Sequence, residues 1–280
     1  MDATLRTTLL TGLKDGSIVP YLGPGVLTDV VHGKTGAPMP ATSEQLILAI
    51  NGGKPMAPKL MYEFSRAAMN IELKRGRSAV TRFLDTTYDD EDWTRSRLHD
   101  WLKMLGPNYV IDINRDTQLL NSHARRPHTL IVGCARIGGT DYRFKLYSHD
   151  GAVYSPALPE AIDPRQPILF KPMGCPRPQP SYIASDADYV DYITELMGGF
   201  SVPSFVKKLR PGKRYLLLGM RLNRDTERMV LADLIHGAAS SPAGWAMIPN
   251  PTVKEQRYLS RSGIELIEED GLALLEEASV

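Results

Sequence analysis

A glycine-rich turn near the N-terminus is the first stretch whose residue types suit a binding site. An apolar run at residues 18–22 ends abruptly in Gly23-Pro24-Gly25. Glycine lets a backbone approach a ligand closely, and the N–H groups of such a loop can bind phosphate oxygens. An ordinary turn has the same composition, and Pro24 removes one donor from the loop. The stretch predicts a strand that ends in a turn, with phosphate binding as the functional alternative.

A second group of polar residues follows another apolar segment. Residues 109–113 predict a buried strand, and Asn114, Arg115 and Asp116 come directly after it. Open α/β sheets bind ligands at the carboxyl ends of their strands, which is where these side chains would lie. Asp116 also suits a simple helix-capping role, whereas Asn114 at the end of a buried strand is harder to explain in that way. Asn114 and Asp116 are therefore candidate catalytic residues.

The other nucleophilic and metal-ligating residues form no recognisable motif. Cys134 and Cys175 are too few for a four-cysteine zinc site, and free buried thiols are typical of a reducing cytoplasm. His123, His128 and His149 are each explained more readily as structural than as catalytic histidines. We therefore expect no metal site, and the sequence contains no recognisable Ser-His-Asp or Walker motif.

Strands that alternate with helices must position these residues. Strands are predicted near residues 18–22, 109–113, 128–135, 142–147, 168–170, 214–219, 245–248 and 264–267. The alternation predicts an α/β fold, a Rossmann-like, mostly parallel sheet with helices on both faces. Residues 59–106 carry a helical pattern throughout, and we interpret them as a small helical insertion within a single domain of residues 1–280.

Length, charge and hydropathy exclude several other classes of protein. A chain of 280 residues can bury a sizeable core, and a hydrophobic content of 42% is typical of a globular protein. The 33 basic and 32 acidic residues leave a formal charge of +1, so no general attraction to nucleic acid or membranes is indicated. No apolar run approaches the length of a membrane span, and the N-terminus lacks a signal-peptide pattern, so we expect a cytoplasmic protein.

Five motifs, taken in order, resemble the SIR2-like domain family, which comprises bacterial relatives of sirtuins. They are residues 19–25 (VPYLGPG), 111–116 (IDINRD), 170–174 (FKPMG), 185–189 (SDADY) and 217–225, which hold Leu217-Leu218-Gly219 and Leu222-Asn223-Arg224-Asp225. A terminal strand and helix over residues 263–277 also match. Order and spacing carry the resemblance, which extends over nearly the whole chain.

The resemblance implies an NAD⁺ site over the strand ends of a Rossmann-like sheet. Asn114 would lie beside the nicotinamide ribose, with Asp116 as the family's acid two residues on. The residues implied for the pyrophosphate are Gly23, Pro24, Gly25 and Val26. Those implied for the adenine-ribose end are Gly219, Asn223 and Asp225, the last of which is also explained as a helix cap.

Two departures from the family pattern bear on activity. The family's catalytic histidine precedes a glycine after a short strand, and here Met173 holds that position before Gly174. A thioether cannot accept a proton, so the usual base is missing. Nearby Lys171 suits phosphate binding but would be a poor base. The zinc ribbon of sirtuins needs four cysteines, so we expect no zinc and no deacetylation of the sirtuin kind.

Three functions remain open at the level of the sequence. The first is an NAD⁺ glycohydrolase-type protein, impaired by Met173 and built on Asn114 and Asp116. The second is a binding module that keeps NAD⁺, ADP-ribose or only the fold and contacts a partner protein. The third is a Rossmann-like enzyme of another kind, such as one acting on sugar nucleotides. Family members that deplete NAD⁺ in bacterial antiviral defence act in oligomers with a sensor, so we expect a homo-oligomer or a separate protein partner.

Overall fold

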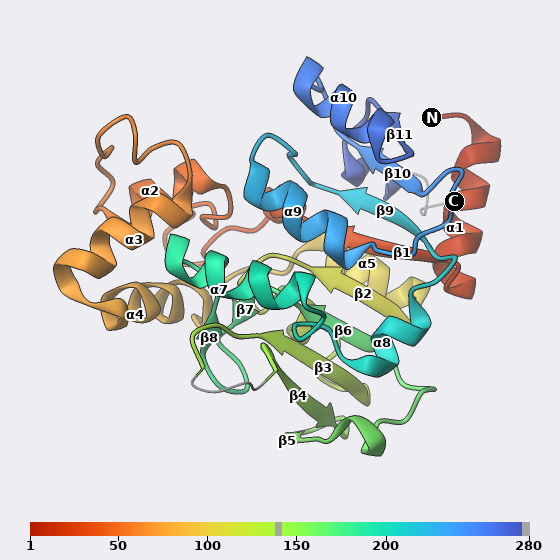
Figure 1. Ribbon diagram of the computed structural model, residues 1–280, viewed down its shortest axis with the longest axis horizontal. Helices are drawn as coiled ribbons and strands as arrows, with labels where there is room; N and C mark the ends of the chain where they lie inside the picture. Colours follow the sequence, from red (N-terminus) through yellow and green to blue (C-terminus); the bar gives the residue numbers. More distant parts are fainter. Residues whose placement is uncertain (138–141, 276–280) are drawn as a thin grey trace.

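A nine-stranded sheet lies at the centre of the molecule (Figure 1). The computed structural model describes residues 1–137 and 142–275. The strand order is β11-β10-β9-β1-β2-β6-β3-β4-β5. The parallel strands are β1 (Ile18–Leu22), β2 (Tyr109–Asp112), β3 (His128–Gly133), β6 (Ile168–Lys171), β9 (Arg214–Leu218), β10 (Gly244–Met247) and β11 (Ile264–Ile267). The antiparallel strands at one edge are β4 (Phe144–His149) and β5 (Tyr154–Pro156).

Both faces of the sheet are covered, as the apolar strands require. In β1 every residue is buried, and successive side chains point to opposite faces. Ile18 and Leu22 belong to one hydrophobic cluster, while Val19 and Tyr21 belong to the other. Such continuous apolar runs are typical of parallel strands with helices on both sides.

The helices divide between these two faces. One face is covered by α1 (Ala3–Asp15), α5 (Arg97–Leu105), α6 (Gln118–Ser122) and the 3₁₀ helix η3 (Gly271–Leu274). The other face is covered by α7 (Asp186–Met197), α8 (Ser204–Leu209), α9 (Asp225–Leu234) and α10 (Val253–Arg261). The sheet with its two helical layers confirms the predicted Rossmann-like fold class.

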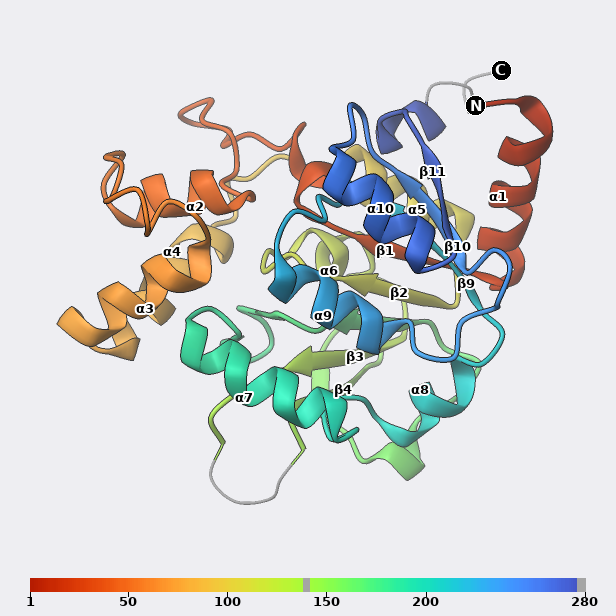
Figure 2. The same cartoon turned by 45° about the horizontal axis from the view of Figure 1, so that its top comes forward.

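A separate group of helices gathers at the end of the sheet toward which the parallel strands point (Figures 1 and 2). It consists of α2 (Ser43–Ile50), α3 (Phe64–Arg75) and α4 (Arg77–Tyr88), which we call the helical layer. The short η1 (Pro24–Leu27) leads from β1 toward it. Of the helices within residues 59–106, α3 and α4 belong to this layer, whereas α5 packs against the sheet.

Several short elements differ from what the sequence predicts. The segment 150–165, interpreted as loop, contains β5 and the 3₁₀ helix η2 (Pro159–Ala161), and α8 was not predicted. The proline-rich loop after Met173 is the turn of a small hairpin, β7 (Gly174–Cys175) and β8 (Ser181–Tyr182). The predicted final helix is only η3 among the described residues, and its expected apolar position Ala278 lies outside them.

Candidate functional site

Two adjoining cavities form one cleft at the carboxyl ends of β1, β2, β6 and β9, beside the helical layer. Pro24, Ser43 and Glu227 line both cavities and so join them. We call them the inner section, of about 70 Å³, and the outer section, of about 400 Å³. This is the edge at which open α/β sheets bind their ligands.

Asn114 lies in the wall of the inner section and is held firmly. Its side chain is almost fully buried, and its amide nitrogen donates hydrogen bonds to the Gly23 carbonyl (3.0 Å) and to Asp112 Oδ1 (2.9 Å). Both amide hydrogens are thereby used, so the side-chain carbonyl is the group that remains to meet a ligand. Asn114 thus lies at a cavity, and its catalytic and NAD⁺-binding roles stay predictions.

Behind Asn114 lies a buried charged network. Lys171 Nζ donates to Asp112 Oδ2 at 2.8 Å, and His99 Nε2 lies 3.4 Å from the same oxygen. His99 Nδ1 is in turn 2.8 Å from the Ser96 hydroxyl. Burial alone would raise the pKa of the Asp112 carboxyl, but Lys171 and His99 together lower it to about 2. Lys171 is fully buried in this ion pair, so it does not reach the cleft as a phosphate ligand.

Asp116 lies apart from the cleft. Its side chain is fully buried, Oδ1 accepts a hydrogen bond from the N–H of Gln118 at 2.7 Å, and Oδ2 is 4.0 Å from Lys171 Nζ. It lines neither section. The structure thus places Asp116 just before Thr117, the N-cap residue of α6, where its carboxylate binds the first N–H of the helix. This contact is close to the helix-capping role that the sequence offers as an alternative.

Met173 lines the inner section together with Asn114. It follows β6, and only 3% of its surface is exposed. The thioether therefore occupies a position from which a side chain could meet a ligand beside Asn114. It offers no group that can take up a proton.

The glycine-rich loop packs closely against the end of β9. A Cβ added to Gly25 would lie 2.8 Å from the Gly219 Cα, and one added to Gly219 would lie 2.5 Å from the Val26 nitrogen. The N–H groups of Gly23, Gly25 and Val26 donate to the carbonyls of Leu218, Gly219 and Gly23, respectively. The glycines permit this close approach, and their N–H groups are used within the protein rather than directed at a phosphate. Pro24 and Gly25 still line the outer section, whereas Gly23 and Val26 lie behind it.

Two arginines, Arg221 and Arg224, bring positive charge to the outer section, where they lie with Gly219 and Asn223. The Arg224 guanidinium stacks 3.8 Å from the centre of the Tyr62 ring, which belongs to the loop between α2 and α3 of the helical layer. Asp225, by contrast, lines neither section: its side chain is 79% exposed and pairs with Arg228 at 3.1 Å.

Several polar groups line the inner section although no motif in the sequence around them predicts a site. Glu63 precedes α3, and Glu227 lies in the first turn of α9. The pKa of Glu227 is raised to about 7, first by burial and further by the negative charge of Glu63. The hydroxyls of Tyr21 and Ser65 are buried, and among the described residues neither has a hydrogen-bond partner. Tyr21 belongs to the motif over residues 19–25, but Glu63, Ser65 and Glu227 were missed.

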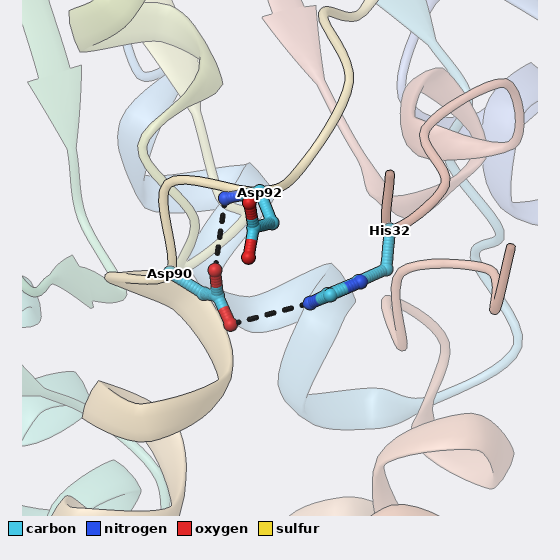
Figure 3. Close-up of side chains that lie close together, drawn as sticks. All are labelled: His32, Asp90 and Asp92. Atoms are coloured by element: carbon cyan, nitrogen blue, oxygen red, sulfur yellow. Dashed lines mark hydrogen bonds and ion pairs between the residues drawn. The ribbon is translucent and has the colours of Figure 1, made fainter. Parts of the chain in front are cut away.

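A cluster of His32, Asp90 and Asp92 has potential metal-ligating groups that converge (Figure 3). His32 Nδ1 accepts hydrogen bonds from the N–H groups of Lys34 (3.2 Å) and Thr35 (3.3 Å), so the ring proton is on Nε2, toward Asp90. A metal would need the Nε2 lone pair, and Lys34 Nζ already occupies Asp92 at 2.5 Å. The contacts are those of a hydrogen-bonded link between two loops rather than of a metal site.

The three remaining histidines considered from the sequence lie away from the cleft. His128 begins β3 and stacks on His149, with ring centres 4.6 Å apart, and His123 meets His128 edge-on. They gather near the amino end of β3, whereas the cleft lies at the carboxyl ends of the strands. None of the three lines either section.

Comparisons with known proteins agree with this fold and motif order. Within the described part of the chain, no helix combines the length and apolar composition that a membrane crossing requires. No curated protein sequence matches the chain. The family model of the SIR2-like domain matches residues 129–267, which include Met173, Gly219 and Asn223. By this match, the chain is a relative of the SIR2-like domain family over residues 129–267.

Proposed function

We propose that the cleft binds NAD⁺, with the adenosine half in the outer section and the nicotinamide ribose in the inner section. One observation carries this proposal: residues implied for the two ends of the dinucleotide line one continuous cleft. Asn114 and Met173 lie in the inner section, and Gly219 and Asn223 in the outer section. The unpartnered hydroxyls of the inner section add support, because a buried polar group without a partner is costly unless a ligand or water satisfies it.

The charge of the cleft is compatible with a diphosphate at its outer end. Arg221 and Arg224 both line the outer section, and guanidinium groups bind phosphate oxygens in a bidentate manner. The N–H groups of the glycine loop are engaged within the protein, and Arg221 is paired with Glu255 at 3.0 Å, so Arg224 takes the role that the loop would otherwise have. An outer section of about 400 Å³ is in the usual size range of ligand pockets.

We further propose that the protein is of NAD⁺ glycohydrolase descent and is impaired at its usual base. Met173 stands in the cavity wall where the family has histidine, and loss of a general base typically lowers a rate by about 10²–10⁴-fold. A module that binds NAD⁺ or ADP-ribose and acts through a partner protein or a second copy is the alternative. Met173 favours that alternative, while Asn114 and the retained cleft favour nucleotide binding in either case.

Nicotinamide release and nucleotide binding, measured on the same preparations, test the proposal. Wild-type protein, Asn114→Ala and Met173→His are incubated with NAD⁺, and calorimetry gives the affinity for NAD⁺ and ADP-ribose. We expect binding by the wild type, weaker binding by Asn114→Ala and faster release by Met173→His. Failure of the wild type to bind either nucleotide would contradict the proposal and favour a partner-binding scaffold.

A further inference from the structure

The inner section contains a pair of carboxylates that the SIR2-like motifs do not account for. We propose that Glu227 accepts a proton from the water that attacks the ribose of NAD⁺, while Glu63 stabilises the positive charge that develops on the sugar. This inference rests on the proposed NAD⁺ site and assigns to Glu227 the role that Met173 cannot perform. The two residues come from different parts of the fold, Glu63 from the start of α3 in the helical layer and Glu227 from the first turn of α9.

Hydrogen bonding distinguishes the two acids. The Thr226 hydroxyl donates a hydrogen bond to Glu63 Oε1, which fixes this carboxylate in place. Glu227 is held by a longer hydrogen bond, which its Oε2 accepts from the backbone N–H of Arg224 at 3.4 Å. Both carboxylates line the same cavity as Asn114 and Met173. A fixed anion and a second acid that can change its protonation state are the two groups that hydrolysis of a glycosidic bond uses.

The surroundings of Glu227 support a proton-accepting role at neutral pH. Burial and the charge of Glu63 raise the pKa of Glu227 to about 7, so that the carboxylate and the acid are both populated there. Other titratable or charged groups that act on Glu227, or that it affects in turn, are Arg224, Glu255, Tyr21 and Tyr189. Arg224 is the cation among them, and it opposes the rise.

The proposed step is balanced without any further reactant. The bond between the ribose C1′ and the nicotinamide nitrogen breaks, and its electron pair leaves with nicotinamide, which becomes neutral. The oxygen of water forms the new bond to C1′, and one water proton passes to Glu227. ADP-ribose and nicotinamide are released, and Glu227 returns its proton to solvent. The side-chain carbonyl of Asn114 is placed to orient the water or a ribose hydroxyl.

The test follows nicotinamide release from NAD⁺ by wild-type protein, Glu227→Gln, Glu227→Asp and Glu63→Gln between about pH 5.5 and 8.5. Glu160→Gln is the control, because Glu160 is an exposed acid on η2, away from the cleft. We expect the wild-type rate to rise with pH through about 7 and then level off, since the base works in its ionised form. Glu227→Gln should lose about 10²–10⁴-fold and the pH dependence, and Glu227→Asp should recover part of the rate.

Affinity for ADP-ribose, measured on the same variants, separates this inference from the proposed function. Retained affinity in Glu227→Gln with lost release supports the catalytic role. Wild-type protein that binds ADP-ribose but releases no nicotinamide, or Glu227→Gln with an unchanged rate, would overturn it and leave the binding site intact. Wild-type protein that binds no nucleotide would overturn both proposals. Thermal melting of each variant shows that a lost rate is not lost folding.

Discussion

Asn114 is held in place by a network of buried side chains that do not line the cleft. Its amide is fixed by Asp112, and Asp112 is fixed by Lys171 and His99 in a fully buried network. A buried ion pair contributes little net stability, but removing one partner leaves an uncompensated charge. Each member of the network is therefore needed to keep the others satisfied and in place.

We expect Lys171→Met to lower the free energy of unfolding by about 3–5 kcal/mol, because Asp112 would remain as an unpaired buried carboxylate. The double variant Asp112→Leu/Lys171→Met should recover much of this loss, because no charge then stays buried. Urea denaturation measures both. Lys34→Met, which removes a largely exposed lysine, is the control and should leave the free energy of unfolding nearly unchanged. A loss of similar size in Lys171→Met and Lys34→Met would contradict the argument.

Among the elements, the close approach of the β1 turn to the end of β9 is what brings the two sections together. Gly219 has a φ of +66° and faces the backbone of Gly25 and Val26 at once. It therefore has two separate reasons to be glycine: its backbone conformation and the lack of space for a side chain.

A comparison of two glycines separates these reasons. Gly212 also has a positive φ, of +75°, but no described atom lies within 4 Å of an added Cβ. Gly212→Ala should cost about 1–2 kcal/mol of unfolding free energy, from the backbone conformation alone. Gly219→Ala should cost about 1–3 kcal/mol more, because the Val26 nitrogen lies 2.5 Å from the new carbon, and it should weaken NAD⁺ binding. Denaturation and calorimetry measure these effects, and equal losses of stability would argue against a tight turn.

The sequence predicts the long elements well because each carries its own periodic signal. The apolar run before Gly23 forms β1, and the run before Asn114 forms β2. Ser185 is the N-cap residue of α7, as the capping pattern predicts. The short β5 and α8 were missed because they hold too few residues to show a period. Of the residues that the motifs suggest for a ligand, Asn114, Met173, Gly219 and Asn223 line the cleft that the structure contains.

The remaining site residues could not be predicted because long-range packing brings them together. Glu63 and Thr226 are 163 positions apart, and only the tertiary fold makes them hydrogen-bonded neighbours. Asp116 and Asp225 illustrate the reverse case. Their positions in the motifs suggest a ligand, yet one side chain turns into the core and the other into solvent.

At the scale of the whole molecule, the clustered histidines near the amino end of β3 affect stability rather than the cleft. Burial lowers the pKa of both His123 and His128 to about 4, from an ordinary value of 6.5. The folded protein therefore favours the neutral rings, whereas the unfolded chain takes up protons at a higher pH. Acidification thus favours the unfolded state.

We expect the free energy of unfolding to decline as the pH falls from about 6.5 to about 4, by up to ~3 kcal/mol for each of the two histidines. Urea denaturation at several pH values measures the decline. The double variant His123→Asn/His128→Asn removes both titrations and should have a flatter pH profile, even if it is less stable at pH 7. A profile as steep as that of the wild type would assign the acid sensitivity to carboxylates.

The inner section is built from two parts of the chain. The family match covers residues 129–267, which supply Met173 and Glu227, whereas Tyr21, Glu63 and Asn114 lie before it. A fragment limited to the matched residues would therefore carry the thioether and one carboxylate of this cavity without the asparagine and the second carboxylate, and it could not form the site by itself.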